Sequence, residues 1–143
     1  AALQAPDYLG GTLEPTIGQG AVSLGRGGQL VVSFTDNFLT GSGDTRPDLA
    51  IYEVGESERV FVEVSSDGNR YTSVGTIDGF RRTIDLDAFG FNPSSRLRFV
   101  RLTDDANDGS ISGDSVGADI DAVGALSTLV IPSYAPLGTG ILV

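Results

Sequence analysis

The chain has 143 residues, 40% of them hydrophobic, which is enough for one folded domain with a hydrophobic core. Nineteen acidic residues against nine basic ones, all arginine, give a formal charge of −10, which disfavours nucleic acid and anionic membrane surfaces as partners. Cys and His are absent, which excludes disulfides, thiol nucleophiles, the Ser-His-Asp triad and imidazole metal sites. A metal bound here must therefore be a hard cation with oxygen ligands.

The first half of the chain predicts short strands joined by glycine-rich turns. Residues 21–24 and 29–35 are both strand-like and are separated by the turn at 25–28, so we expect them to pair as a β-hairpin. A polar loop follows at 36–48, and residues 49–54 predict the next strand.

Alternation of side chains gives the clearest strand signal. In residues 58–65 the valines occupy every second position, which is typical of a strand with one buried face. The turn at Asp67-Gly68 then reverses the chain into a strand at 70–75.

The second half continues the same pattern. Residues 81–86, 96–102 and 118–126 predict further strands, and residues 87–90 predict a single helical turn. We expect most of the phenylalanines to lie in the core. These are Phe34, Phe61, Phe80, Phe89, Phe91 and Phe99.

Short strands, regular turns and the lack of a long amphipathic helix predict an all-β fold. The expected architecture is an antiparallel β-sandwich, or jelly roll, of about eight strands. We expect residues 1–126 to form a single β-sandwich domain and residues 127–143 to form a final edge strand or a C-terminal linker or tail. No apolar run reaches the roughly 18 residues of a membrane-spanning helix. The chain begins at Ala1 and lacks Met, which a removed signal peptide or a trimmed chain would each explain, and we expect a secreted or cell-surface protein.

Oxygen-bearing side chains gather at strand ends in a way that predicts a calcium site. Ca²⁺ takes six to eight oxygen ligands, and in a jelly roll the final strand commonly lies beside an early one. Two of the acids stand two residues apart on the last predicted core strand and so share a face, where turn capping does not explain them. Turn capping remains the alternative for those in the loop at 36–48. The expected ligands are Asp36, Asn37, Asp48, Asp104, Asp119 and Asp121.

The order of several short motifs resembles a known group of modules. The motifs are at 22–25, 34–37, 47–55, 62–68 and 117–123. Over roughly residues 20–126 the chain is similar to galactose-binding-like jelly rolls of bacterial surface and secreted proteins, a group that includes discoidin-type domains and carbohydrate-binding modules. The stretch at 64–75 is most like a discoidin-type domain, but it carries Tyr71 where Trp is usual. The resemblance implies a glycan or cell-surface polysaccharide as partner.

The predicted function is a non-catalytic, calcium-binding module that binds glycan or mediates adhesion. One alternative is a small glycan-active enzyme with Glu53 and Glu63 as paired carboxylates, although salt bridges to arginine account for such residues more simply. A third reading is a structural spacer or assembly module, in which the uncharged tail adds a strand to a neighbour.

Overall fold

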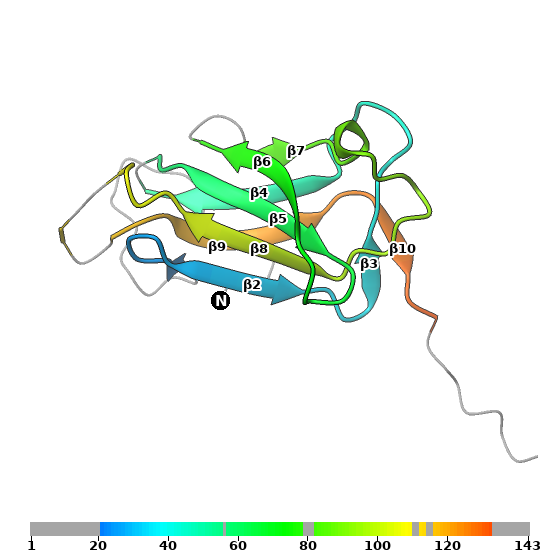
Figure 1. Ribbon diagram of the computed structural model, residues 1–143, viewed down its shortest axis with the longest axis horizontal. Coiled ribbons are helices and arrows are strands. Elements are labelled where there is room, and N and C mark those ends of the chain that lie inside the picture. Colours follow the sequence, from blue (N-terminus) through cyan, green and yellow to red (C-terminus); the bar gives the residue numbers. More distant parts are fainter. Residues whose placement is uncertain (1–20, 56, 79–81, 110–111, 114–115, 133–143) are drawn as a thin grey trace, which may run out of the picture.

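The computed structural model describes residues 21–132 except 56, 79–81, 110–111 and 114–115, and every structural statement below concerns those described residues. They form ten strands and one short 3₁₀ turn, η1 (Figure 1). The bounds are β1 Val22–Ser23, β2 Gln29–Ser33, β3 Asn37–Leu39, β4 Leu49–Val54, β5 Val60–Ser65, β6 Thr72–Ile77, β7 Thr83–Ile84, η1 Asp87–Phe89, β8 Phe99–Asp104, β9 Asp119–Ala125 and β10 Thr128–Val130.

Two four-stranded antiparallel sheets form a sandwich, with strand orders β1-β9-β4-β7 and β2-β8-β5-β6. Without β3 and β10, the eight remaining strands renumbered along the chain follow the orders 1-8-3-6 and 2-7-4-5. This is the strand order of a jelly roll, so the predicted fold class is confirmed. The count is ten strands rather than about eight because β3 and β10 pair separately as a two-stranded arm.

The prediction of a hairpin across the turn at 25–28 is wrong. β1 pairs with β9 and β2 pairs with β8, so this turn carries the chain from one sheet to the other. The Gly28 N–H donates to the Gly25 carbonyl at 2.8 Å and closes a tight turn, as it would in a hairpin. Local turn chemistry is therefore the same in both cases, and pairing with distant strands decides the outcome. The second expected reversal is confirmed, since β5 pairs with β6.

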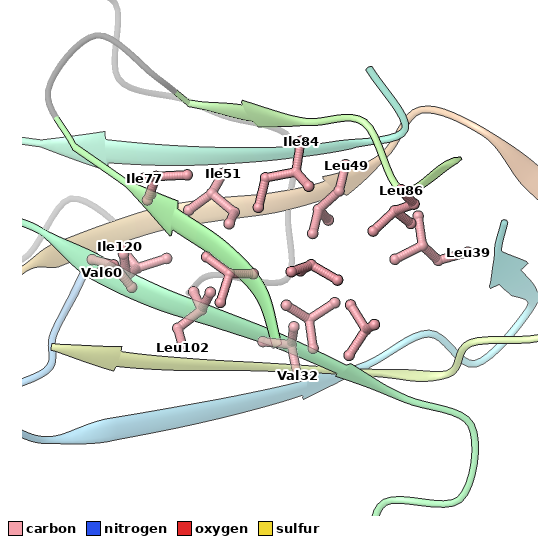
Figure 2. Close-up of a cluster of buried hydrophobic side chains, with 14 of the residues drawn as sticks. Val32, Leu39, Leu49, Ile51, Val60, Ile77, Ile84, Leu86, Leu102 and Ile120 are labelled. Carbon is pink, nitrogen blue, oxygen red and sulfur yellow. The ribbon is translucent and has the colours of Figure 1, made fainter. Parts of the chain in front are cut away.

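The core between the sheets is aliphatic. The three valines of the alternating strand, Val60, Val62 and Val64, are fully buried, which confirms their predicted facing. Figure 2 shows the buried aliphatic side chains as one continuous row, with Leu39 and Leu86 at one end and Ile120 and Val60 at the other.

The expectation that the phenylalanines form the core is wrong for two of them. Phe61 and Phe89 are 43% and 41% exposed. Phe61 lies between inward-facing valines on β5, and the two-residue alternation therefore turns it to the outer face. Phe34 and Phe91 are only partly buried against the core, and Phe80 lies outside the described residues.

The sandwich has two chemically distinct ends, and β4 runs from one to the other. At the arm end, Leu49 pairs with Ala125 close to β3, β10 and η1. At the loop end, Val54 pairs with Asp119, close to the connections at 55–59 and 105–118. Six residue steps along a strand separate Asp48 from Val54, which is about 20 Å.

Candidate metal centre

Asp48 is fully buried at the arm end, immediately before β4. Its backbone is fixed on two sides, since its N–H donates to the Ile84 carbonyl at 2.8 Å and its carbonyl accepts from the Leu126 N–H at 2.7 Å. Its carboxylate oxygen Oδ2 accepts the Leu86 N–H at 2.8 Å.

The other carboxylate oxygen of Asp48 has no hydrogen-bond donor among the described residues. An oxygen that is both buried and without a donor is rare in folded proteins, because its lost hydration is not compensated. A cation beside Oδ1 would supply that compensation.

Two further carboxylates converge on Asp48. One oxygen from each of Asp48, Asp85 and Asp87 lies within 4.8 Å of the other two. Asp85 and Asp87 are half-buried and alternate with Ile84 and Leu86, which are buried in the core just before η1. Asp85 lies between β7 and η1 and Asp87 is the first residue of η1, so the chain turns at the end of β7 with both acids beside Asp48.

The polar loop at 36–48 holds Asp87 in place. The Gly43 N–H donates to both Asp87 oxygens, at 3.2 and 3.1 Å, and the Ser42 hydroxyl lies 3.5 Å from Asp87 Oδ2. A side chain at Gly41 would collide with this arrangement, since its Cβ would stand 2.6 Å from Asp87 Oδ2 and 2.9 Å from Asn92 Cα. Gly41 is thus a glycine because the backbone passes directly against the carboxylate.

Within the described ranges, no arginine forms a salt bridge with any of the three acids. Arg46 is nearby in sequence, but its exposed side chain pairs with Asp44 at 2.9 Å and acts on Asp48 only through a weaker Coulomb attraction. Three carboxylates at this spacing, one of them buried, match the hard oxygen ligands that calcium or magnesium requires, with further ligands from carbonyls or water. They do not suit metals that prefer nitrogen or sulfur.

Of the six ligands predicted from the sequence, only Asp48 belongs to this cluster. Asp104, Asp119 and Asp121 all lie at the loop end, with Asp119 paired to Val54 about 20 Å from Asp48. Asp104 already accepts the N–H groups of Gly27, at 2.7 Å, and Ala118, at 2.9 Å.

The other members of the predicted set are also held away from Asp48. Asp119 accepts the Ser23 hydroxyl, and Asp121 is the extra residue of a β-bulge in β9. Asp36 is exposed, and its carbonyl accepts the Ile131 N–H, while Asn37 pairs with Val130 along the arm. Four residue steps down the arm separate Asp36 from Thr40, about 13 Å.

The sequence analysis missed Asp85 and Asp87, although the signal for them was present. Ile84-Asp85-Leu86-Asp87 alternates apolar and acidic residues in the same way as Asp119-Ile120-Asp121. Both segments carry two acids separated by one apolar residue, and nothing in either pattern says which pair meets a third acid.

The two glutamates of the enzyme alternative lie on different sheets. Glu63 on β5 pairs with Arg101 at 2.6 Å, as expected for a cross-strand salt bridge, and this carboxylate raises the pKa of Arg101. Glu53 on β4 is buried and accepts the Glu58 N–H at 2.9 Å. The Arg101 guanidinium also lies 4.0 Å from the centre of the Tyr71 ring, so a cation already covers one face of that aromatic.

No helix in the described part of the chain is long and apolar enough to cross a bilayer. The resemblance to galactose-binding-like modules remains an expectation, and the oxygen ligands at the arm end are the firmest guide to function. Comparisons with protein-family models, with curated proteins and with solved structures find no match to this chain.

Proposed function

We propose that this chain is a non-catalytic β-sandwich module stabilised by a calcium ion, held by Asp48, Asp85 and Asp87. The observation that carries the proposal is Asp48, whose buried Oδ1 lacks a hydrogen-bond donor among the described residues and whose carboxylate converges with two others. Calcium is preferred over magnesium because it tolerates irregular sets of carboxylates, whereas magnesium needs a near-ideal octahedron and retains several waters.

The ion would act as a structural clamp at the arm end. Asp48 belongs to the start of β4, and its carbonyl accepts from Leu126 just before β10. Asp87 belongs to η1 and is held by the loop at 41–43. A cation shared by these acids would therefore join the start of β4 to the segment at 85–87, and it would stabilise the native state alone.

A secreted or cell-surface setting suits such a site. Extracellular modules bind calcium with dissociation constants of about 10⁻⁴–10⁻³ M, so millimolar calcium keeps them largely loaded. The jelly-roll strand order supports the likeness to glycan-binding and adhesion modules at the level of fold, and that partner class is part of the proposal.

The test is thermal unfolding in EDTA, in millimolar calcium and in millimolar magnesium. At a hundredfold excess over the dissociation constant, calcium should stabilise the wild type by about 2.7 kcal/mol. Asp48→Asn should lose this response because it removes the buried charge and keeps the side-chain shape. Asp36→Asn is the matched control, since Asp36 was also predicted as a ligand but lies exposed beside the arm, and it should respond as the wild type does.

Two results would overturn the proposal. One is a wild type whose melting temperature is the same in EDTA and calcium. The other is an Asp48→Asn variant that responds to calcium as strongly as the wild type.

The arm supports a second candidate function, assembly through the edge of β10. All three residues of β10 are exposed, with Val130 at 72%, and among the described strands β10 pairs with β3 alone. Residues 122–143 contain no charged residue in a chain of net charge −10, so this edge is where a second copy meets the least repulsion. The proposed partner is therefore a second copy, joined edge to edge.

Sedimentation at increasing protein concentration tests this assembly. The wild type should form a dimer that Val130→Lys weakens, because a charge on an edge strand blocks pairing. A wild type that stays monomeric at every concentration would contradict it.

A further inference from the structure

Glu53 is an acid placed on the core side of the sandwich at the loop end. It follows Leu49 and Ile51 on the inward-facing positions of β4, and only 4% of it is exposed. Its Oε1 accepts the backbone N–H of Glu58 at 2.9 Å, across the β4–β5 connection. Its partner opposite on β9 is Ile120, a fully buried core residue. Glu53 therefore occupies the rim of the hydrophobic core.

The segment that carries Glu58 is bound to a second loop. Glu58 is itself buried, and it lies so close to Gly109 that a side chain there would overlap its carboxylate. The Arg59 N–H donates to Asp108 Oδ2 at 3.0 Å, and the Arg59 guanidinium pairs with Asp105 at 3.2 Å. The Asp105 N–H returns a bond to the Arg59 carbonyl at 2.9 Å. Glu53 is thus linked through Glu58 to the two loops at 57–59 and 105–109.

The charges around Glu53 are mostly negative. Burial raises the pKa of Glu53 to about 7, against an ordinary value of 4.5. The Glu58 N–H bond lowers this pKa, the Glu58 carboxylate raises it, Arg82 beside β7 lowers it and Asp119 on β9 raises it. These contributions come from the β4–β5 connection, the segment before β7, and β9. Near neutral pH the buried carboxyl therefore still holds its proton in part of the molecules.

A proton, rather than a metal ion, is the species that suits this position. Within the described ranges, Asp48, Asp85 and Asp87 are the only acids whose oxygens converge in a group of three, and they lie at the arm end. Asp104 at the loop end is already bonded to two backbone N–H groups. Glu53 lies outside the one group of three carboxylates found among the described residues, so protonation is the way to neutralise it.

We infer that Glu53 is a proton-operated latch for the loop end: with its proton it stays buried while the loops at 57–59 and 105–109 close over this end, and loss of the proton releases them. The physical reason is hydration. An ionised carboxylate is far more stable in water than at the rim of a core, so opening is favoured once Glu53 is charged. This inference concerns the loop end alone and does not depend on the calcium site.

The size of the effect follows from proton linkage. If the open state returns Glu53 to its ordinary pKa of 4.5 from about 7, the opening equilibrium rises about thirtyfold between about pH 5.5 and about pH 8. The change should be local, because the arm end contains no part of this linkage.

Hydrogen exchange of individual amides in EDTA tests the latch. After correction for the intrinsic effect of pH on exchange, protection of the Glu58 and Asp105 amides should fall by up to about thirtyfold over this range. Protection of the Leu86 amide, which donates to Asp48 at the arm end, should stay constant. Glu53→Gln, which keeps an acceptor for Glu58 and cannot ionise, should abolish the pH dependence. Glu63→Gln is the matched control and should retain it, because Glu63 lies on the other sheet.

A second measurement covers the case in which Glu53→Gln does not fold. The carboxyl carbon of Glu53 in the wild type, followed by NMR, should titrate with a midpoint near 7, together with the loss of amide protection. A midpoint near 4.5, or loop protection that does not change with pH, would overturn the inference. Because calcium is absent throughout, neither result bears on the metal centre.

Discussion

The two ends of the sandwich are both rich in acids, but within the described residues only the arm end brings three carboxylates together. At the loop end, Asp104 accepts two backbone N–H groups, at 2.7 and 2.9 Å, so amide donors balance its charge. At the arm end, Asp48 is more deeply buried, receives one backbone N–H, and has a second oxygen that meets no donor among the described residues. The difference teaches that acidic density does not identify a metal site. The candidate site is distinguished by three converging carboxylates, of which Asp48 has a buried oxygen without a hydrogen-bond donor among the described residues.

The largest effect we predict is at the loop end, where the free energy of unfolding should depend on pH. The pKa of Glu53 is raised in the folded state, to about 7 from 4.5, so its stabilising contribution is complete below pH 4.5 and is lost as the pH rises through about 7. From this group alone, the wild type in EDTA should lose up to about 3 kcal/mol of unfolding free energy over that interval. Glu53→Gln should remove that loss, as measured by urea unfolding at a series of pH values. A wild-type contribution that rises with pH would contradict the assignment.

The next effect concerns the arm end without metal. In EDTA, Asp48→Asn should raise the free energy of unfolding by about 1–2 kcal/mol, because it removes a buried charge that accepts only one backbone N–H, from Leu86. In saturating calcium the order should reverse, with the wild type more stable. The measurement is urea unfolding in both buffers. A variant that is destabilised equally in EDTA and in calcium would mean that Asp48 acts through packing and not as a ligand.

A smaller effect is expected at Gly41, whose backbone passes against Asp87. Gly41→Ala should displace Asp87 Oδ2, which would stand 2.6 Å from the new Cβ, and weaken calcium binding about tenfold, or about 1.4 kcal/mol. Gly124→Ala is the control, because a Cβ there would meet only the Tyr52 ring at an ordinary 3.8 Å. Calorimetric titration with calcium measures both affinities. Equal calcium affinities in the two variants would mean that the loop at 41–43 does not contribute to the site.

The smallest effect is expected at the salt bridge between the ends. Glu63 and Arg101 are joined at 2.6 Å on the outer face of the second sheet and are only partly buried, with side chains 24% and 28% exposed. Glu63→Gln should lower the free energy of unfolding by about 0.5 kcal/mol, as is usual for such pairs. The change in the free energy of unfolding should be the same with and without calcium. This result would distinguish the surface ion pair from the buried acids at the two ends of the sandwich.

Much of the fold could be predicted because it depends on local patterns. The valines at 60, 62 and 64 alternate with polar residues and are buried, since a strand with one buried face requires that period. The turn at 87–90 is also present as predicted, with η1 closed by Gly90 at φ 87°. The β1–β2 hairpin failed for the opposite reason: its turn is locally correct, but each strand finds its partner elsewhere.

The candidate metal centre likewise depends partly on local sequence patterns and partly on the tertiary structure. The alternation of acids with apolar residues at Ile84-Asp85-Leu86-Asp87, and the position of Asp48 at a strand end, are properties of the sequence. They limit any metal to a hard cation and place acids at the ends of a sandwich. Which acids meet is a property of the tertiary structure, because Leu49 pairs with Ile84 and thereby brings Asp48 against the segment that carries Asp85 and Asp87. Burial, which arises only when the sheets pack, then leaves Asp48 Oδ1 without a hydrogen-bond donor among the described residues at one end and raises the pKa of Glu53 at the other.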